Sequence, residues 1–200
     1  MNQSVGKSDG TTATTDISIR WQWLTGFVLT SLLAFYGTLL QAGHPAGDSM
    51  RLFQLEQATP VVSAPGLALP GLDGTMHQLS DYQGQVVVIN FWSTWCAPCR
   101  REMPALEKAW QRLKPAGVVV LAVAMQDDPE MVRRFLQESG VTFPILLDQD
   151  GKASQQWSFS GIPATFVLDK RSRIIYRAMG LREWDSDEII HRLIELAERE

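Results

Sequence analysis

Apolar runs separated by helix-like stretches dominate the second half of the sequence. Residues 86–92 and 118–125 are nearly continuous apolar, β-branched segments, which is typical of strands buried on both faces. Residues 98–113, between them, have a helical composition, and residues 129–139 predict a further helix that ends at Gly140. This alternation predicts an α/β fold with a central mixed β-sheet and helices on both of its faces.

Shorter patterns predict the elements on either side of this core. Residues 67–69 and 76–79 flank a Pro- and Gly-containing turn, which predicts an N-terminal β-hairpin extension. Residues 165–168 and 174–178 flank a charged turn and predict a second hairpin. We expect the final helix to begin at Asp185 with a capping box, followed by one apolar stripe.

The N-terminal part of the chain has a different character. Residues 1–20 are rich in Ser and Thr, which predicts a disordered cytoplasmic tail. Residues 21–42 contain no Asp, Glu, Lys or Arg, and their 17-residue apolar centre is just long enough to cross a bilayer core of roughly 30 Å. We therefore expect a transmembrane helix at 21–42, a linker at 43–58 and the folded domain at 59–200.

The alternative for residues 21–42 is a cleaved signal peptide. No clear small–x–small cleavage site follows them, which favours a retained anchor. Lys7 and Arg20 precede the span, and the next basic residue is Arg51, so we expect the N-terminus inside and the folded domain on the extracytoplasmic side, a periplasm in bacteria. The net charge of −4 and the lack of a basic patch argue against nucleic-acid binding.

The chain contains only two cysteines, Cys96 and Cys99, which are separated by two residues. A disulfide between them closes too small a loop to stabilise the fold much, so the pair is more plausibly chemical than structural. Cys96 follows a predicted buried strand and opens a helix, where free backbone N–H groups favour a thiolate. Pro98 suits the first helical turn because it has no N–H to leave unpaired.

Other chemistry for the pair is less well supported. A zinc site needs four ligands, and His44, His77 and His191 lack a suitable spacing, so we expect no metal site. A c-type haem site requires His directly after the second cysteine, where Arg100 stands. We expect no cofactor other than the redox-active disulfide itself.

Two separated motifs carry a family resemblance. NFWSTWCAPCRREMP at 90–104 resembles the active-site stretch of thioredoxin-like proteins, above all the membrane-anchored branch that includes TlpA, ResA and the cytochrome c maturation reductases. GIPATF at 161–166 is similar to the cis-proline loop of that superfamily, and parts of 64–81 resemble its N-terminal hairpin. The resemblance covers about residues 60–200 and implies a thioredoxin-like fold.

The resemblance also implies roles for individual residues. Cys96 is the expected nucleophile, and Cys99 the thiol that resolves the mixed disulfide. Thioredoxin has a buried Asp where this chain has Asn90, which cannot titrate, whereas Glu102 matches a Glu of the anchored reductases and is a candidate proton acceptor for Cys99. The alternative is that Glu102 is an ordinary solvent-exposed helix residue.

Substrate contacts are expected around the pair and at the cis-proline loop. The residues concerned are Trp95, Ala97, Pro98, Ile162 and Pro163. Pro163 is expected to follow a cis peptide bond with its ring facing the disulfide, although an ordinary trans loop proline is the alternative. Ile162 is expected to offer backbone groups to a bound partner.

The resulting functional hypothesis is an extracytoplasmic thiol–disulfide oxidoreductase that reduces specific protein disulfides, for example in the maturation of cytochrome c or other metalloproteins. Its partners would be those proteins and a membrane electron donor. A general thiol oxidant or disulfide isomerase, a peroxide-reducing enzyme and a thiol-independent holdase are the alternatives. The first usually has His before its second cysteine, where Pro98 stands here.

Overall fold

The computed structural model describes residues 54–199. The predicted tail at 1–20, the predicted transmembrane helix at 21–42 and the linker as far as residue 53 lie outside the described residues, so these remain predictions. Within residues 54–199, no helix combines the length and the apolar character needed to span a bilayer.

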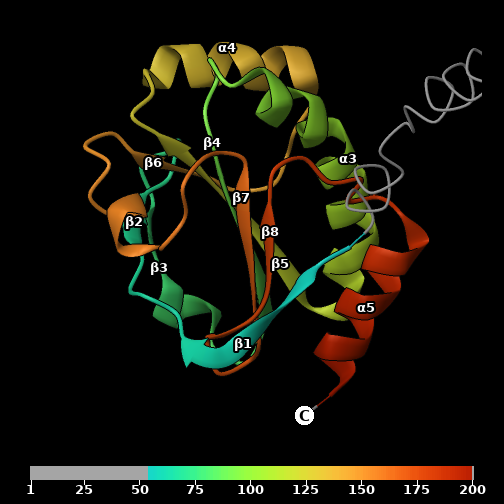
Figure 1. The fold of residues 1–200 in the computed structure, drawn as a ribbon. Coiled ribbons are helices and arrows are strands. Elements are labelled where there is room, and N and C mark those ends of the chain that lie inside the picture. Colours follow the sequence, from blue (N-terminus) through green and yellow to red (C-terminus); the bar gives the residue numbers. More distant parts are fainter. Residues whose placement is uncertain (1–53, 200) are drawn as a thin grey trace, which may run out of the picture. The chain divides into compact units, whose positions relative to one another are not determined.

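A mixed sheet of six strands forms the centre of the described domain (Figure 1). Its strands are β1 (Glu56–Ser63), β4 (Val86–Trp92), β5 (Val118–Met125), β6 (Ile145–Asp148), β7 (Ala164–Leu168) and β8 (Arg173–Met179). They lie in the order β1-β8-β7-β4-β5-β6. The β4–β5 and β5–β6 pairs are parallel and the other pairs are antiparallel, which confirms the predicted mixed sheet.

Helices and a small hairpin complete the domain. The long helices are α3 (Ala97–Leu113), α4 (Pro129–Ser139) and α5 (Asp187–Glu198), and short 3-10 helices span Leu79–Tyr82, Lys114–Ala116 and Ser154–Gln156. The predicted N-terminal hairpin is present as β2 (Ala68–Pro70) and β3 (Met76–Gln78), which pair antiparallel. Asp128 caps α4, and Gly140 ends it in the left-handed conformation at φ 70°, which glycine adopts without strain.

Alternate residues of β4 point into two different cores. Val86, Val88 and Trp92 pack in a hydrophobic cluster with residues of α3, α4 and α5. Val87 and Phe91 belong to a second cluster, which is covered by the β2–β3 hairpin and by residues near the Ser154–Gln156 helix. In the described residues the three long helices therefore lie on one face, and the opposite face, which was also predicted to carry helices, has only short 3-10 helices and the hairpin. Two parallel crossovers, through α3 and α4, run in the same direction along the sheet and put their helices on one face.

Two element boundaries also differ from the predictions. Strand β1 begins at Glu56, so the end of the predicted linker at 43–58 belongs to the sheet, paired with β8. Helix α5 begins at Asp187 rather than Asp185, and its N-cap makes no side-chain hydrogen bond. The Asp185 carbonyl instead accepts a hydrogen bond from Arg112 of α3 at 2.9 Å, which holds this residue in the turn before the helix.

Candidate active site

The cysteine pair lies where β4 passes into α3. Cys96 is the N-cap of α3, and its sulfur accepts a hydrogen bond from the backbone N–H of Cys99 at 3.3 Å. The two residues form a disulfide with a Cα–Cα distance of 5.3 Å, so the structure represents the oxidised protein. Cys99 is fully buried and Cys96 is 5% exposed, which leaves Cys96 as the sulfur that a partner can reach. This asymmetry supports the predicted division into attacking and resolving thiols.

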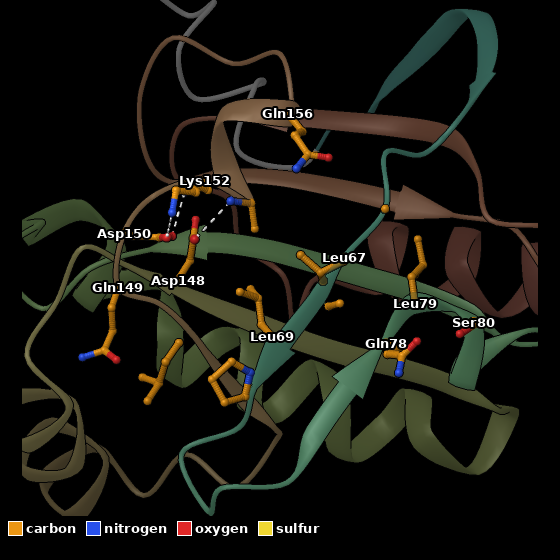
Figure 2. A pocket seen from close by; sticks show the side chains of 15 residues that line it. Leu67, Leu69, Gln78, Leu79, Ser80, Asp148, Gln149, Asp150, Lys152 and Gln156 are labelled. Carbon is orange, nitrogen blue, oxygen red and sulfur yellow. Dashed lines mark hydrogen bonds and ion pairs between the residues drawn. The ribbon is translucent and has the colours of Figure 1, made fainter.

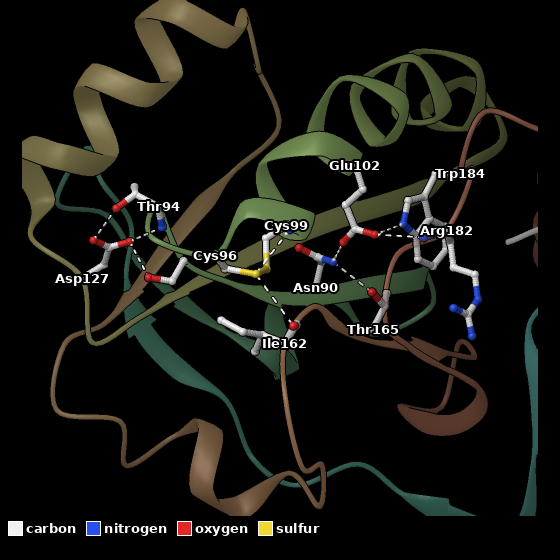
Figure 3. Close-up of a disulfide and its surroundings, with 11 residues drawn as sticks. Asn90, Thr94, Cys96, Cys99, Glu102, Asp127, Ile162, Thr165, Arg182 and Trp184 are labelled. Atoms are coloured by element: carbon white, nitrogen blue, oxygen red, sulfur yellow. Dashed lines mark hydrogen bonds between the residues drawn. A yellow bond between two sulfur atoms is a disulfide. The ribbon is translucent and has the colours of Figure 1, made fainter. Parts of the chain in front are cut away.

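The loop before Cys96 is held by one carboxylate. Asp127, which follows β5, accepts hydrogen bonds from the Ser93 hydroxyl at 2.8 Å and from the Thr94 backbone N–H and hydroxyl at 2.6 and 2.8 Å (Figure 3). Asp127 directly precedes Asp128, the N-cap of α4, and belongs to no sequence motif that marks it as a site residue. Its position at the carboxyl end of the neighbouring parallel strand explains how it reaches this loop.

The predicted substrate-contact residues surround Cys96 on its exposed side. The peptide before Pro163 is cis, as the resemblance implies, and the Ile162 carbonyl oxygen lies 3.7 Å from the Cys96 sulfur. Trp95 is 69% exposed although it is directly attached to the buried pair. Ala97 is exposed and Pro98 half-buried at the first turn of α3. The backbone and aromatic surface next to the reactive sulfur is therefore open to a partner.

Glu102 lies on α3, one turn after Cys99, and is only 2% exposed. Its Oε1 accepts a hydrogen bond from Asn90 Nδ2 at 2.8 Å, and its Oε2 accepts from the Arg182 backbone N–H at 3.2 Å and from Trp184 Nε1 at 3.3 Å (Figure 3). Burial raises the pKa of Glu102 from 4.5 to about 7, and these hydrogen bonds oppose the rise. The alternative of a solvent-exposed Glu102 is wrong.

Three residues around Glu102 were not identified as site residues from the sequence. They are Thr165, which accepts a hydrogen bond from Asn90, and Arg182 and Trp184, which donate to Glu102. Arg182 is buried, and its guanidinium donates to the backbone carbonyls of Gln54, Met179, Gly180 and Leu181. These contacts fix the loop that brings the Arg182 N–H to the carboxyl group. Because that loop is 80 residues away from Glu102 along the chain, no local sequence signal reveals the contact.

A hollow of about 910 Å³ lies outside the cysteine site (Figure 2). It is lined by residues of the β2–β3 hairpin and the 3-10 helix after it, and by the end of β6 and the segment that follows, including Leu69, Leu79, Asp148 and Gln156. Neither cysteine nor Glu102 lines it. In residues 54–199, no three His, Cys, Asp or Glu side chains are grouped so as to hold a metal ion.

Comparison with known proteins identifies the family to which the chain belongs. The AhpC/TSA family matches residues 61–177. The thiol-disulfide oxidoreductase ResA of Geobacillus kaustophilus is 38% identical over 112 residues, which are 56% of this chain and 64% of that protein. The chain thus spans less than two thirds of this relative. The ResA of Bacillus subtilis is 31% identical over 151 residues, or 76% of this chain and 80% of that protein.

Solved structures agree in fold. A secreted thiol-disulfide isomerase from Corynebacterium glutamicum is 27% identical with a TM-score of 0.64, and the alignment covers 73% of this chain and 92% of that one. A thioredoxin family thiol:disulfide interchange protein from Chlorobium tepidum, at 22% identity and a TM-score of 0.60 over 67% of this chain and 97% of that one, shows the same fold. The resemblance noted in the sequence is confirmed, and the chain belongs to the AhpC/TSA family as a thioredoxin-like relative of the ResA thiol-disulfide oxidoreductases.

Proposed function

We propose that this protein is an extracytoplasmic thiol–disulfide reductase that acts on disulfides of specific partner proteins, such as those in cytochrome c or other metalloprotein maturation. The observation that carries the proposal is the buried carboxyl group of Glu102 next to a helix-capping disulfide. Burial raises the pKa of Glu102 to about 7, so the group exchanges a proton near neutral pH, where a resolving thiol must release one.

The reaction begins with the reduced dithiol. The Cys96 thiolate attacks one sulfur of the partner disulfide, forms a mixed disulfide and expels the other partner sulfur, which takes up a proton. Cys99 then gives its proton to the Glu102 carboxylate and attacks the Cys96 sulfur. The second partner sulfur leaves and is protonated, so the partner gains two electrons and two protons. The protein is left with the Cys96–Cys99 disulfide seen in the structure.

The surroundings of Cys96 support a protein as the substrate. Cys96 is the less buried of the two cysteines, and the nearby Ile162 carbonyl provides an acceptor for a backbone N–H of an extended partner segment. The exposed indole of Trp95 offers the aromatic contact area that is enriched in protein interfaces. We infer that Ala97 and Pro98 complete this contact surface.

Renewal of the dithiol requires an electron donor. We propose that the segment at 21–42 holds the protein at a membrane and that a membrane protein reduces the disulfide on the extracytoplasmic side. The apolar, uncharged character of residues 21–42 supports the anchor. The related structure from Corynebacterium glutamicum is of a secreted protein, and the same side of the membrane is proposed for this domain.

The test uses Cys99→Ser in the full chain, expressed in intact membranes. This variant lacks the resolving thiol and is expected to accumulate mixed disulfides through Cys96, detected as adducts that disappear on reduction. Cys96→Ser is the matched control and should trap none. Adducts absent from Cys99→Ser would contradict thiol exchange and favour a holdase. In the wild-type protein, acid-quenched alkylation should find mainly the dithiol, whereas a mainly oxidised pair would identify an oxidant.

A further inference from the structure

The side chain of Asn90 on β4 lies between the disulfide and Glu102 (Figure 3). It is fully buried. Its amide nitrogen donates to Glu102 Oε1 at 2.8 Å and to Thr165 Oγ1 at 2.9 Å, so both amide hydrogens are used. Thr165 is the direct cross-strand partner of Asn90 in the β4–β7 register. These two bonds fix which way the amide points.

The amide oxygen of Asn90 has no hydrogen-bond partner among the described residues, although it is buried. Figure 3 shows this oxygen on the side of the disulfide and the amide nitrogen on the side of Glu102. A carbonyl oxygen can accept two hydrogen bonds, and buried acceptors are rarely left without one. The sulfurs of a disulfide carry no hydrogen, so the oxidised site cannot supply a donor.

We propose that Asn90 Oδ1 accepts a hydrogen bond from the Cys99 thiol when the disulfide is reduced, which makes Asn90 a positioning residue that links the resolving thiol to Glu102. The inference rests on the proposed function, in which Cys99 resolves the mixed disulfide. Reduction adds two electrons and two protons to the pair, and the proton that arrives on the Cys99 sulfur is the missing donor.

This hydrogen bond exists only in the reduced protein, so it favours the dithiol over the disulfide. It also favours the neutral Cys99 thiol over its thiolate, because a carbonyl oxygen facing an anion is repulsive. Three charged or titratable residues surround the amide: Glu102 on α3, Arg182 in the segment after β8, and Cys96. The other polar neighbours, Thr165 and Trp184, are neutral. When Glu102 is ionised, it polarises the amide and strengthens the acceptor.

An infrared measurement of the S–H stretch tests the hydrogen bond directly. In full-length Cys96→Ser, Cys99 is the only thiol, and its band is expected at the lower frequency of a bonded S–H. Adding Asn90→Leu removes the acceptor and should move the band to higher frequency. Thr165→Val is the matched control, since it removes the other partner of the amide but leaves Oδ1 in place. An unmoved band in Asn90→Leu, or an equal shift in Thr165→Val, would overturn the proposal.

The redox equilibrium of the wild-type pair gives the second readout. Against a glutathione buffer, Asn90→Leu should shift the equilibrium about tenfold toward the disulfide, which corresponds to ~30 mV for this two-electron couple. Thr165→Val should shift it less than about twofold. If Asn90→Leu does not fold, Asn90→Asp decides the matter. It keeps an acceptor oxygen, so the low-frequency band must persist, and its loss would refute the inference.

These measurements separate this inference from the proposed function. The S–H band of the Cys96→Ser protein needs neither a partner nor an electron donor. A hydrogen-bonded S–H together with no trapped partners would support the Asn90–Cys99 hydrogen bond and contradict the proposed reductase function. Trapped partners together with an S–H that is not hydrogen-bonded would support the proposed function and contradict the role of Asn90.

Discussion

Replacing Glu102 with Gln should change how the stability of the oxidised protein depends on pH. The pKa of Glu102 is raised from 4.5 to about 7 by burial, a difference of about 3 kcal/mol at roughly 1.4 kcal/mol per pKa unit. As the pH rises through this window, the unfolded chain loses the Glu102 proton first, so the unfolded state binds fewer protons than the folded state. The contribution of Glu102 to the free energy of unfolding must therefore fall by about 3 kcal/mol between pH 4.5 and 7, then level off.

Gln carries no charge, so Glu102→Gln should lack this fall. All three groups that contact the carboxyl group are hydrogen-bond donors, and the Gln amide nitrogen cannot accept from them. That mismatch lowers the free energy of unfolding by an amount that does not depend on pH. The quantity to compare is therefore the slope of the free energy of unfolding against pH. Urea unfolding followed by Trp fluorescence from pH 4.5 to 8 measures it.

The matched control is Glu138→Gln on α4, where the side chain is exposed. This variant should keep the wild-type pH dependence. Ionisable groups other than the two substituted side chains are common to all three proteins, so their contribution cancels in the difference between them. Parallel curves for the wild type and Glu102→Gln would refute the reasoning, because they would mean that Glu102 ionises equally readily in the folded and unfolded states.

Three further changes have defined outcomes. Trp184→Phe removes an N–H that favours the charged form of Glu102, so the pKa of Glu102 should rise further and the fall in stability, which still begins near pH 4.5, should extend to higher pH in the same urea titrations. Asp127→Ala leaves the buried Ser93 hydroxyl and the Thr94 N–H without their acceptor and should lower the free energy of unfolding by about 2 kcal/mol in urea. Trp95→Ala should change stability by less than about 0.5 kcal/mol because the side chain is exposed, yet slow stopped-flow exchange with a protein disulfide more than exchange with a small disulfide.

Elements with a strong local signal were predictable from the sequence. Strands β4 and β5 are nearly continuous apolar runs, and the structure gives them the predicted bounds, 86–92 and 118–125. Helix α4 has the predicted bounds because Asp128 caps its start and Gly140 adopts the left-handed conformation at its end. The cysteine pair and the cis-proline loop were found because each is a compact motif.

Elements that depend on distant partners were not predictable. Strand β1 was missed because seven of its eight residues are exposed, so its sequence lacks the alternation of a half-buried strand. It exists as a strand through its pairing with β8. The contacts of Glu102 with Arg182 and Trp184 span 80 and 82 positions. The placement of α3 and α4 on one face depends on the direction of the two crossovers. Periodicity reports local geometry and says nothing about such pairings.

The two cysteines are close together in the sequence, whereas Glu102 is far from two of its hydrogen-bond donors. The disulfide and the raised pKa of Glu102 can therefore form at different stages of biosynthesis. Cys96 and Cys99 are three positions apart, so their sulfurs meet even in a chain without tertiary structure. Glu102 receives two of its three donors from residues 182 and 184, which leave a ribosome some 80 residues later. Oxidation of the pair is therefore no sign of completed folding, whereas titration of Glu102 near neutral pH is one. A nascent chain halted before residue 182 would carry the disulfide together with an ordinary carboxylate.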